Sequence, residues 1–331
     1  MPDLLLLGAG FSRNWGGWLA TEAFEHLLGS PEVIADDGLR KLLWRHQSQG
    51  GFEAALAELQ QAFGRDPGAN GPPLMALQSA VARMFADMNA AFLEITDWEF
   101  QNSVDRKVGT FLTRFDAIFT LNQDVLLEHH YLNDNIALVG KRKWTGPEMP
   151  GMSRTPSPEA FYANSWARST WTPLPEDNFK ADPRCQPLYK LHGSSNWTRA
   201  DGQPMLIMGG AKVREIGQTP ILNWYAQVFE ESINQAGARL MVIGYGFRDD
   251  HINAAIGRAV AKGLKLFIIA PEGAELGRRI NPTRQPGMIA ASTAEEEMLE
   301  MALIGASRRP MSAIFGGDTA EHNKVLRFFN A

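Results

Sequence analysis

Several features that mark other classes of protein are scarce in this chain of 331 residues. It contains one cysteine, Cys185, which excludes a disulfide framework within the chain and any zinc site built from four thiolates. The apolar run Leu4 to Leu7 is far too short to cross a bilayer and follows no basic leader. We therefore expect a cytoplasmic protein that is not attached to a membrane.

Long runs of positive charge are also missing. The formal net charge is −5, and the basic clusters at 141–143 and 278–279 are short enough to be solvated loops. Direct binding of nucleic acid is therefore not expected. Hydrophobic residues make up 44% of the chain, a proportion typical of a packed protein with one large or two ordinary domains.

The first motif that is present is a glycine turn at the amino terminus. Leu4 to Leu7 predict a buried strand, and the chain continues as Gly8, Ala9, Gly10, Phe11 and Ser12. Glycines allow a close approach of the backbone, so amide groups can converge on a pyrophosphate. The dinucleotide fingerprint is incomplete because Arg13 stands where its third glycine belongs. The turn still predicts a phosphate-binding loop.

Three further apolar segments each end in a polar residue or a glycine. They lead to Asn122 and Asp124, to His192, and to Gly244. The run Leu266 to Ile269 is uniformly apolar, as expected of a parallel strand that is buried on both faces. Open α/β sheets place their ligands at the carboxyl ends of such strands. We predict an α/β fold with a Rossmann-like, doubly wound, mostly parallel sheet.

The remaining segments suggest how the chain is divided. Residues 1–275 are predicted to form the nucleotide-binding domain, and amphipathic spacing within residues 18–110 predicts a helical insertion. A stretch rich in glycine and proline, residues 66–73, is expected to interrupt those helices. Residues 139–185, which combine prolines with tryptophans, are predicted to be an irregular lid of the site. Residues 276–331 are predicted to be a C-terminal helical extension.

Taken in order, the segments GAGFS, TLNQD, KLHG and GYGF resemble the motifs of the sirtuin family. The resemblance implies that NAD is a substrate and that the catalytic residues are Asn122, His192 and Asp124. It also implies a set of residues that bind NAD: Gly8, Ala9, Gly10, Phe11, Ser12, Gly244, Tyr245 and Phe247. A neutral histidine can accept a proton from a hydroxyl or a water, and an asparagine can orient a water.

The departures from the family pattern narrow the expected activity. Sirtuin deacylases carry four zinc cysteines, which this chain lacks, and Leu121 replaces the glutamine of their T-Q-N-x-D segment. The segments IGYGFRDDHIN and LFIIAPEG are similar to bacterial sirtuin-like domains of antiphage defence, which hydrolyse NAD. That likeness implies an NAD hydrolase that yields nicotinamide and ADP-ribose, with a HerA-type ATPase or a short Argonaute as a partner.

Other interpretations remain open. The chain can be a module that senses NAD or ADP-ribose without turnover, or an NAD-dependent deacylase or ADP-ribosyltransferase. A dehydrogenase is less favoured because the glycine fingerprint is incomplete. Asp249, Asp250 and His251 resemble metal ligands by type. Asp249 and Asp250 are expected to cap a helix, and adjacent side chains do not converge on one ion, so no metal site is predicted. Nine tryptophans and an apolar terminus at 326–329 predict a homo-oligomer.

Overall fold

A computed structural model describes residues 1–48, 50–132, 144–156, 165–210, 212–280 and 292–330. Its central element is a sheet of seven strands: β1 (Asp3–Leu7), β2 (Ala117–Thr120), β3 (Pro147–Glu148), β6 (Gln186–Lys190), β9 (Arg239–Ile243), β10 (Lys265–Ile269) and β11 (Leu303–Ser307). The strand order is β11-β10-β9-β1-β2-β6-β3, and neighbouring strands are parallel. The predicted Rossmann-like α/β class is therefore confirmed.

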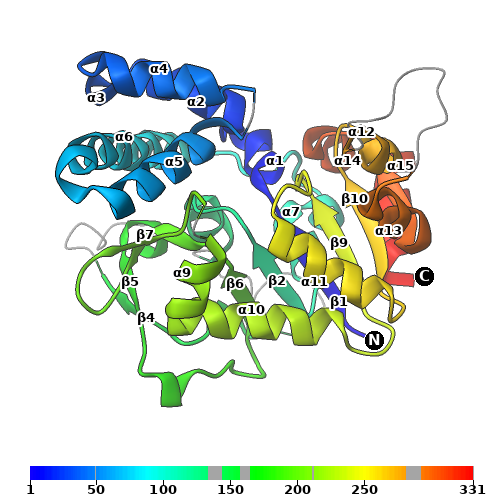
Figure 1. Cartoon of the computed structure of the whole chain (residues 1–331). Helices are drawn as coiled ribbons and strands as arrows, with labels where there is room; N and C mark the ends of the chain where they lie inside the picture. The colour runs from blue at the N-terminus through cyan, green and yellow to red at the C-terminus, as the bar shows by residue number, and fades with distance from the viewer. Residues whose placement is uncertain (49, 133–143, 157–164, 211, 281–291, 331) are drawn as a thin grey trace.

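Helices flank the sheet (Figure 1). They are α1 (Ala9–Ser12), α2 (Ala20–Leu28), α3 (Pro31–Ile34), α4 (Asp37–His46), α5 (Gly51–Arg65), α6 (Pro67–Leu93), α7 (Val108–Leu112), α8 (Ser165–Arg168), α9 (Lys212–Gln218), α10 (Pro220–Ile233), α11 (Asp250–Val260), α12 (Leu276–Ile280), α13 (Ala294–Ala302), α14 (Met311–Gly316) and α15 (Thr319–Leu326). Helices α10 and α11 cross one face of the sheet (Figure 1). None of the helices in the described ranges is long and apolar enough to span a bilayer.

The register of the sheet brings six strand ends to one level. The parallel pairings place these residues in a single row across the sheet: Lys190, Thr120, Leu7, Ile243, Ile269 and Ser307. Each residue that follows the row therefore emerges at the same edge. Four of the strands that form this row, β1, β2, β9 and β10, are buried almost throughout, which explains their uniformly apolar sequences.

The segment predicted as a helical insertion contains α2 to α7. Residues 66–73, expected to interrupt these helices, instead begin the longest one. The side chain of Asp66 caps α6 by accepting hydrogen bonds from the amides of Gly68 and Ala69, and Pro67 occupies the first helical position. Helices α5 and α6 then pack against each other as an antiparallel pair beyond the sheet edge (Figure 1).

Residues 139–185, predicted to be an irregular lid, contribute strands where they are described. Strands β4 (Met152–Thr155) and β5 (Thr170–Pro173) join β7 (Gly193–Thr198) and β8 (Pro204–Leu206) in a second sheet, ordered β4-β5-β7-β8. Trp171 of β5 pairs with Trp197 of β7 in register, and both rings are buried. The tryptophans thus stabilise a small sheet.

The C-terminal segment differs from the helical extension that the sequence suggests. Its strand β11 extends the main sheet by pairing with β10, and its sequence, LIGAS, has too few large apolar residues to indicate a strand by itself. The apolar terminus also has a partner within the chain. Phe328 is 1% exposed and packs on Phe115 and Phe267. The terminus therefore gives no reason to expect a second subunit over it.

Candidate active site

A cavity of about 810 Å³ lies at the edge of the sheet where the six strands end. Its floor is formed by the glycine turn after β1 and by the residues that follow β2, β6 and β9. Helices α2, α5 and α6 form a wall, and residues 308–312, which follow β11, close another side. In the described part of residues 139–185, no side chain lines this cavity. Among the described residues, the helical insertion therefore covers the site, and the described part of the predicted lid does not.

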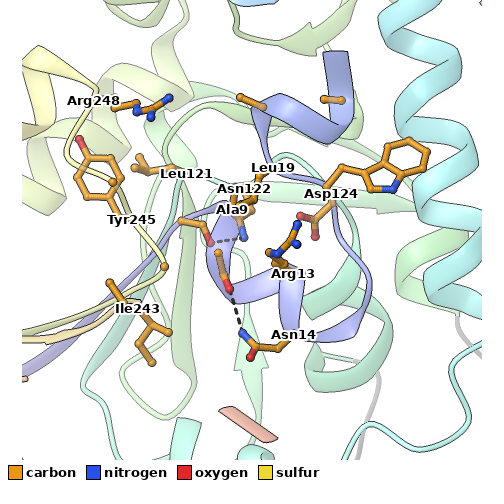
Figure 2. A pocket seen from close by; sticks show the side chains of 18 of the residues that line it. Ala9, Arg13, Asn14, Leu19, Leu121, Asn122, Asp124, Ile243, Tyr245 and Arg248 are labelled. Atoms are coloured by element: carbon orange, nitrogen blue, oxygen red, sulfur yellow. Dashed lines mark hydrogen bonds between the residues drawn. The ribbon is translucent and has the colours of Figure 1, made fainter. Parts of the chain in front are cut away.

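A chain of hydrogen bonds links the ends of β1 and β2. The Asn122 side-chain amide donates to the Ser12 hydroxyl at 2.9 Å, and that hydroxyl donates to Asp124 Oδ2 at 2.8 Å. Asn122 also donates to the Gly8 carbonyl at 3.0 Å, so both of its amide hydrogens are used and its oxygen remains an acceptor. Figure 2 shows Asn122 and Asp124 beside Arg13 at the cavity.

The two glycine turns are packed directly on each other. The Gly10 amide donates to the Gly244 carbonyl at 2.9 Å, and a Cβ built on Gly10 would lie 2.7 Å from the Gly244 Cα. Gly244 has a φ of +66°, which also favours glycine. The amides of Gly8 and Gly10 are thus used within the protein, because they bond to the carbonyls of Ile243 and Gly244. The glycines are required here mainly by this backbone contact.

His192 lies in the turn that follows β6, where it is 3% exposed but contributes to the cavity wall. Burial lowers its pKa to about 3, an effect that the carboxylate of Asp249 opposes and the ammonium of Lys212 reinforces. The ring is therefore neutral at neutral pH and can accept a hydrogen bond. Its Nε2 lies 3.3 Å from His251 Nε2, and one ring donates to the other.

Sequence analysis missed a charged bridge beside His192. Lys212 Nζ lies 2.9 Å from Asp249 Oδ1 and 2.6 Å from Glu53 Oε2, so α9 is tied both to the start of α11 and to α5. Burial is the largest influence on the pKa of Asp249 and acts to raise it, but the nearby His192 and Lys212 outweigh it and the pKa is lowered. The partners come from three separate regions of the sequence, and no local pattern joins them.

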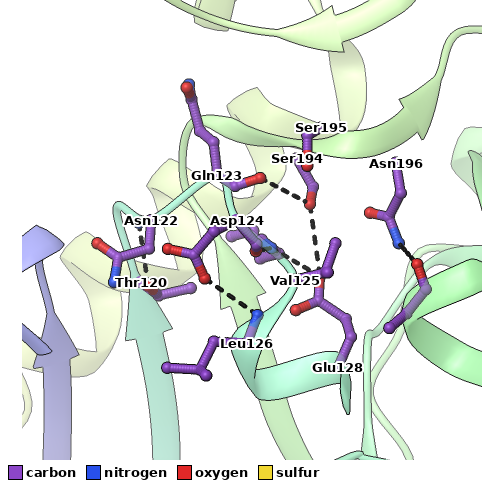
Figure 3. A network of polar contacts seen from close by, with 12 residues as sticks. Thr120, Asn122, Gln123, Asp124, Val125, Leu126, Glu128, Ser194, Ser195 and Asn196 are labelled. Atoms are coloured by element: carbon purple, nitrogen blue, oxygen red, sulfur yellow. Dashed lines mark hydrogen bonds and ion pairs between the residues drawn. The ribbon is translucent and has the colours of Figure 1, made fainter. Parts of the chain in front are cut away.

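Gln123 and Lys190 fix the two segments that carry the proposed catalytic residues. Gln123 Nε2 donates to the His192 carbonyl at 2.9 Å, which holds the turn that carries the histidine. Lys190 Nζ donates to the Asp124 carbonyl at 2.5 Å and pairs with Glu128 at 2.6 Å. Glu128 begins a π-helical turn, residues 128–132, and Ser194 donates to its carboxylate at 3.4 Å (Figure 3). The one sequence signal for this ion pair was Lys190, a charged residue between Tyr189 and Leu191 in an otherwise apolar strand segment.

Four arginines line the cavity, and three of them pair with carboxylates: Arg13 with Glu22, Arg308 with Glu275 and Arg309 with Asp318. Arg13 follows the glycine turn and contacts Glu22, and Arg248 follows the second turn near Tyr245 (Figure 2). Arg308 and Arg309 follow β11. Arginine suits phosphate because its planar guanidinium offers several donors in a fixed geometry. Sequence reasoning missed the last pair because it did not identify β11.

The predicted site residues fall into two groups. Gly8, Ala9, Gly10, Gly244 and Tyr245 line the cavity together with the three proposed catalytic residues, Asn122, Asp124 and His192. A second group lies behind the wall: Phe11, Ser12 and Phe247. Their burial is explained by packing, since Phe11 contacts Trp15, Ser12 bonds Asp124, and Phe247 contacts Tyr245. These three residues can support the site, but they do not face its interior.

The expectation about metal ligands also needs correction. Asp249 was expected to cap a helix together with Asp250, but its side chain makes no capping hydrogen bond at the start of α11. It comes together with His192 and His251 instead, and the three ligand atoms lie within 4.8 Å of one another. They converge because the end of β6 lies against the start of α11. The four-thiolate zinc site of sirtuin deacylases stays excluded, since Cys185 is the only cysteine of the chain.

The parallel sheet, its glycine turn and the polar strand ends define a Rossmann-like protein with a dinucleotide-sized cavity. The SIR2-like domain family model matches residues 116–286, which is 171 of the 331 residues, and the chain belongs to that family. SIR2-like domains use NAD as a substrate, so the predicted resemblance is confirmed at the level of an NAD-utilising domain. A comparison with curated proteins gives no match.

Proposed function

We propose that this protein hydrolyses NAD to nicotinamide and ADP-ribose. The observation that carries the proposal is the hydrogen-bond chain Asn122–Ser12–Asp124 at the cavity, with a neutral His192 at the end of the neighbouring strand. This arrangement presents the amide oxygen of Asn122, the carboxylate of Asp124 and the imidazole of His192 to the same cavity. No nucleophilic side chain is needed, because water can serve as the acceptor.

In the proposed reaction the bond between nicotinamide nitrogen and ribose C1′ breaks, and its electron pair neutralises the pyridinium. The ribose then develops positive charge, which the Asp124 carboxylate stabilises at short range. The amide oxygen of Asn122 accepts a hydrogen bond from the attacking water and aims its oxygen at C1′. The water proton passes to His192 or to solvent. A base with a pKa of about 3 is weak, so proton transfer follows bond cleavage in this scheme.

The rest of the cavity supports a whole dinucleotide. Its volume of about 810 Å³ is within the range of small-molecule sites. The arginines lie toward β1, β9 and β11, whereas Asn122 and His192 lie at β2 and β6. We therefore assign the nicotinamide ribose to the β2–β6 end and the adenosine diphosphate to the other end.

The decisive experiment measures NAD loss and product identity for the purified protein by chromatography. We expect nicotinamide and ADP-ribose in equal amounts, and a loss of turnover of about 100-fold or more in Asn122→Ala and His192→Ala. Ser79→Ala, on the exposed side of α6, is the control. Tight NAD binding without turnover would instead support a sensor, and turnover that requires an acyl-lysine peptide would support a deacylase.

We also propose that the enzyme is an effector of bacterial antiphage defence, working in the cytoplasm as a homo-oligomer or with a HerA-type ATPase or short Argonaute. The motif likeness described above supports this role. Uncontrolled hydrolysis of NAD would harm the host, so activity must depend on assembly. Light scattering gives the oligomeric state and an NAD assay gives the activity, and measuring both at the same protein concentrations tests whether activity depends on assembly. Full activity as a monomer would contradict the proposal.

A further inference from the structure

The cluster of His192, Asp249 and His251 has the composition and spacing of a transition-metal site. His192 and Asp249 line the cavity, whereas His251 lies behind them in the first turn of α11. Their ligand atoms all lie within 4.8 Å of one another. His192 Nε2 and His251 Nε2 are 3.3 Å apart. The cluster thus has one face open to the cavity.

The distance between the two imidazole nitrogens fits their joint coordination of one tetrahedral Zn²⁺ ion. Zn²⁺ binds histidine nitrogen at about 2.0–2.1 Å in a tetrahedron, and the edge of such a tetrahedron is about 3.3–3.4 Å. Two ring nitrogens that face each other at this spacing can share only one proton, but both lone pairs can bind one ion. Two imidazoles with one carboxylate favour Zn²⁺ over Mg²⁺ and Ca²⁺, which prefer oxygen ligands.

The charged groups around the cluster allow a cation to bind reversibly. Lys212 uses only Oδ1 of Asp249, at 2.9 Å, and its charge is also matched by Glu53 at 2.6 Å. The second carboxylate oxygen of Asp249 is therefore available as a ligand. The ammonium still repels a cation, so the site suits a reversibly bound ion better than a permanent structural one.

We propose that His192, Asp249 and His251 form a Zn²⁺ site and that Zn²⁺ bound there inhibits the enzyme. The inhibition follows from the proposed function, because the metal takes the Nε2 lone pair of His192 and fills the end of the cavity assigned to the nicotinamide ribose. The binding site itself depends only on geometry.

Calorimetry with ZnCl₂ on untagged, chelator-treated full-length protein tests the site without any activity measurement. We expect one high-affinity ion per chain in the wild type and a loss of affinity of at least about 100-fold in His251→Gln. His46→Gln is the matched control, since His46 also pairs with a carboxylate, that of Glu58, at 2.7 Å. Circular dichroism verifies that each variant is folded. Equal affinity in the wild type and His251→Gln would overturn the site.

The NAD assay tests the inhibition separately. Each variant is compared with its own rate in the absence of metal. Zn²⁺ should inhibit the wild type and His46→Gln, a chelator should restore the rate, and His251→Gln should resist the same concentration. Zinc binding that depends on His251 in a protein that does not consume NAD would refute the proposed function but retain the metal site. Stimulation by Zn²⁺ would refute the inhibitory role.

Discussion

The hydroxyl of Ser12 donates to Asp124 Oδ2 at 2.8 Å although the two residues are 112 positions apart in the sequence. Both residues are buried: Ser12 is 3% exposed and Asp124 is 7% exposed. This contact joins the turn after β1 to the turn after β2, and the same hydroxyl accepts from Asn122. The serine therefore determines how two of the proposed catalytic groups face the cavity.

Ser12→Ala should slow NAD consumption by about 100-fold, because it removes the acceptor for Asn122 and the donor to Asp124 while leaving a small side chain in place. We expect kcat to fall more than KM rises, since Ser12 does not face the cavity. Steady-state kinetics with Ser79→Ala as control measure the effect. A rate equal to the wild type would show that the chain of hydrogen bonds does not orient the reacting groups.

Gly10→Ala should destabilise the protein by at least about 1–3 kcal/mol, because the new Cβ meets backbone atoms of Gly244 at 2.7 Å that cannot move independently. Denaturant unfolding measures the loss. Gly64→Ala in α5 is the matched control, since nothing lies within 4 Å of its Cβ position, and it should be neutral or stabilising by up to about 1 kcal/mol. Similar stability of the two variants would contradict the close packing of the turns.

Lys190→Met should cost about 3–5 kcal/mol of unfolding free energy, because it leaves the buried carboxylate of Glu128 without its cation. Burial already raises the pKa of Glu128, with Lys190 opposing that shift. The double variant Lys190→Met with Glu128→Leu removes both charges and should recover much of the loss. If the double variant is as unstable as the sum of the single changes, the two residues are not coupled.

Protonation of His192 should not cause kcat/KM to fall as the pH drops through 6.5. Its pKa is lowered to about 3 by burial, so the neutral form is present throughout the range from about pH 5 upward. The rate in that range is measured in the wild type and in Asn122→Ala as background. A limb near pH 6.5 that is absent from a His192 variant would contradict the burial of this ring.

Stability should fall as the pH drops from about 6.5 toward 4. Burial lowers the pKa of His130 to about 4, and the charge of His129 acts in the same direction. Between about pH 6.5 and 4 the unfolded chain therefore binds a proton at this residue and the folded chain does not. His130→Phe keeps a ring parallel to Trp98 and removes the titration. Its unfolding free energy should depend less on pH across this window than that of the wild type. An unchanged slope would exclude His130 as a source.

The sequence by itself determined the sheet class and the edge at which the site lies. Apolar runs that end at Leu7, Phe119 and Ile243 predict parallel strands, and the residues that follow them must share one edge once those strands pair. The glycines of the two turns were also visible, although the reason for them is the contact of one backbone with the other. The same reasoning places Asn122, Asp124 and His192 at one edge, whereas their proposed catalytic role came from the resemblance to the sirtuin motifs.

Only the tertiary structure decided what covers that edge and what supports it. The wall comes from α2, α5 and α6, and no local pattern indicates the surface on which an amphipathic helix packs. Strand β11 lacks an apolar run and forms only because β10 offers it an edge. His192 meets His251 across 59 positions, and Lys190 meets Glu128 across 62. Contacts between distant residues depend on the packed chain, because burial and charge pairing arise only when separate elements meet.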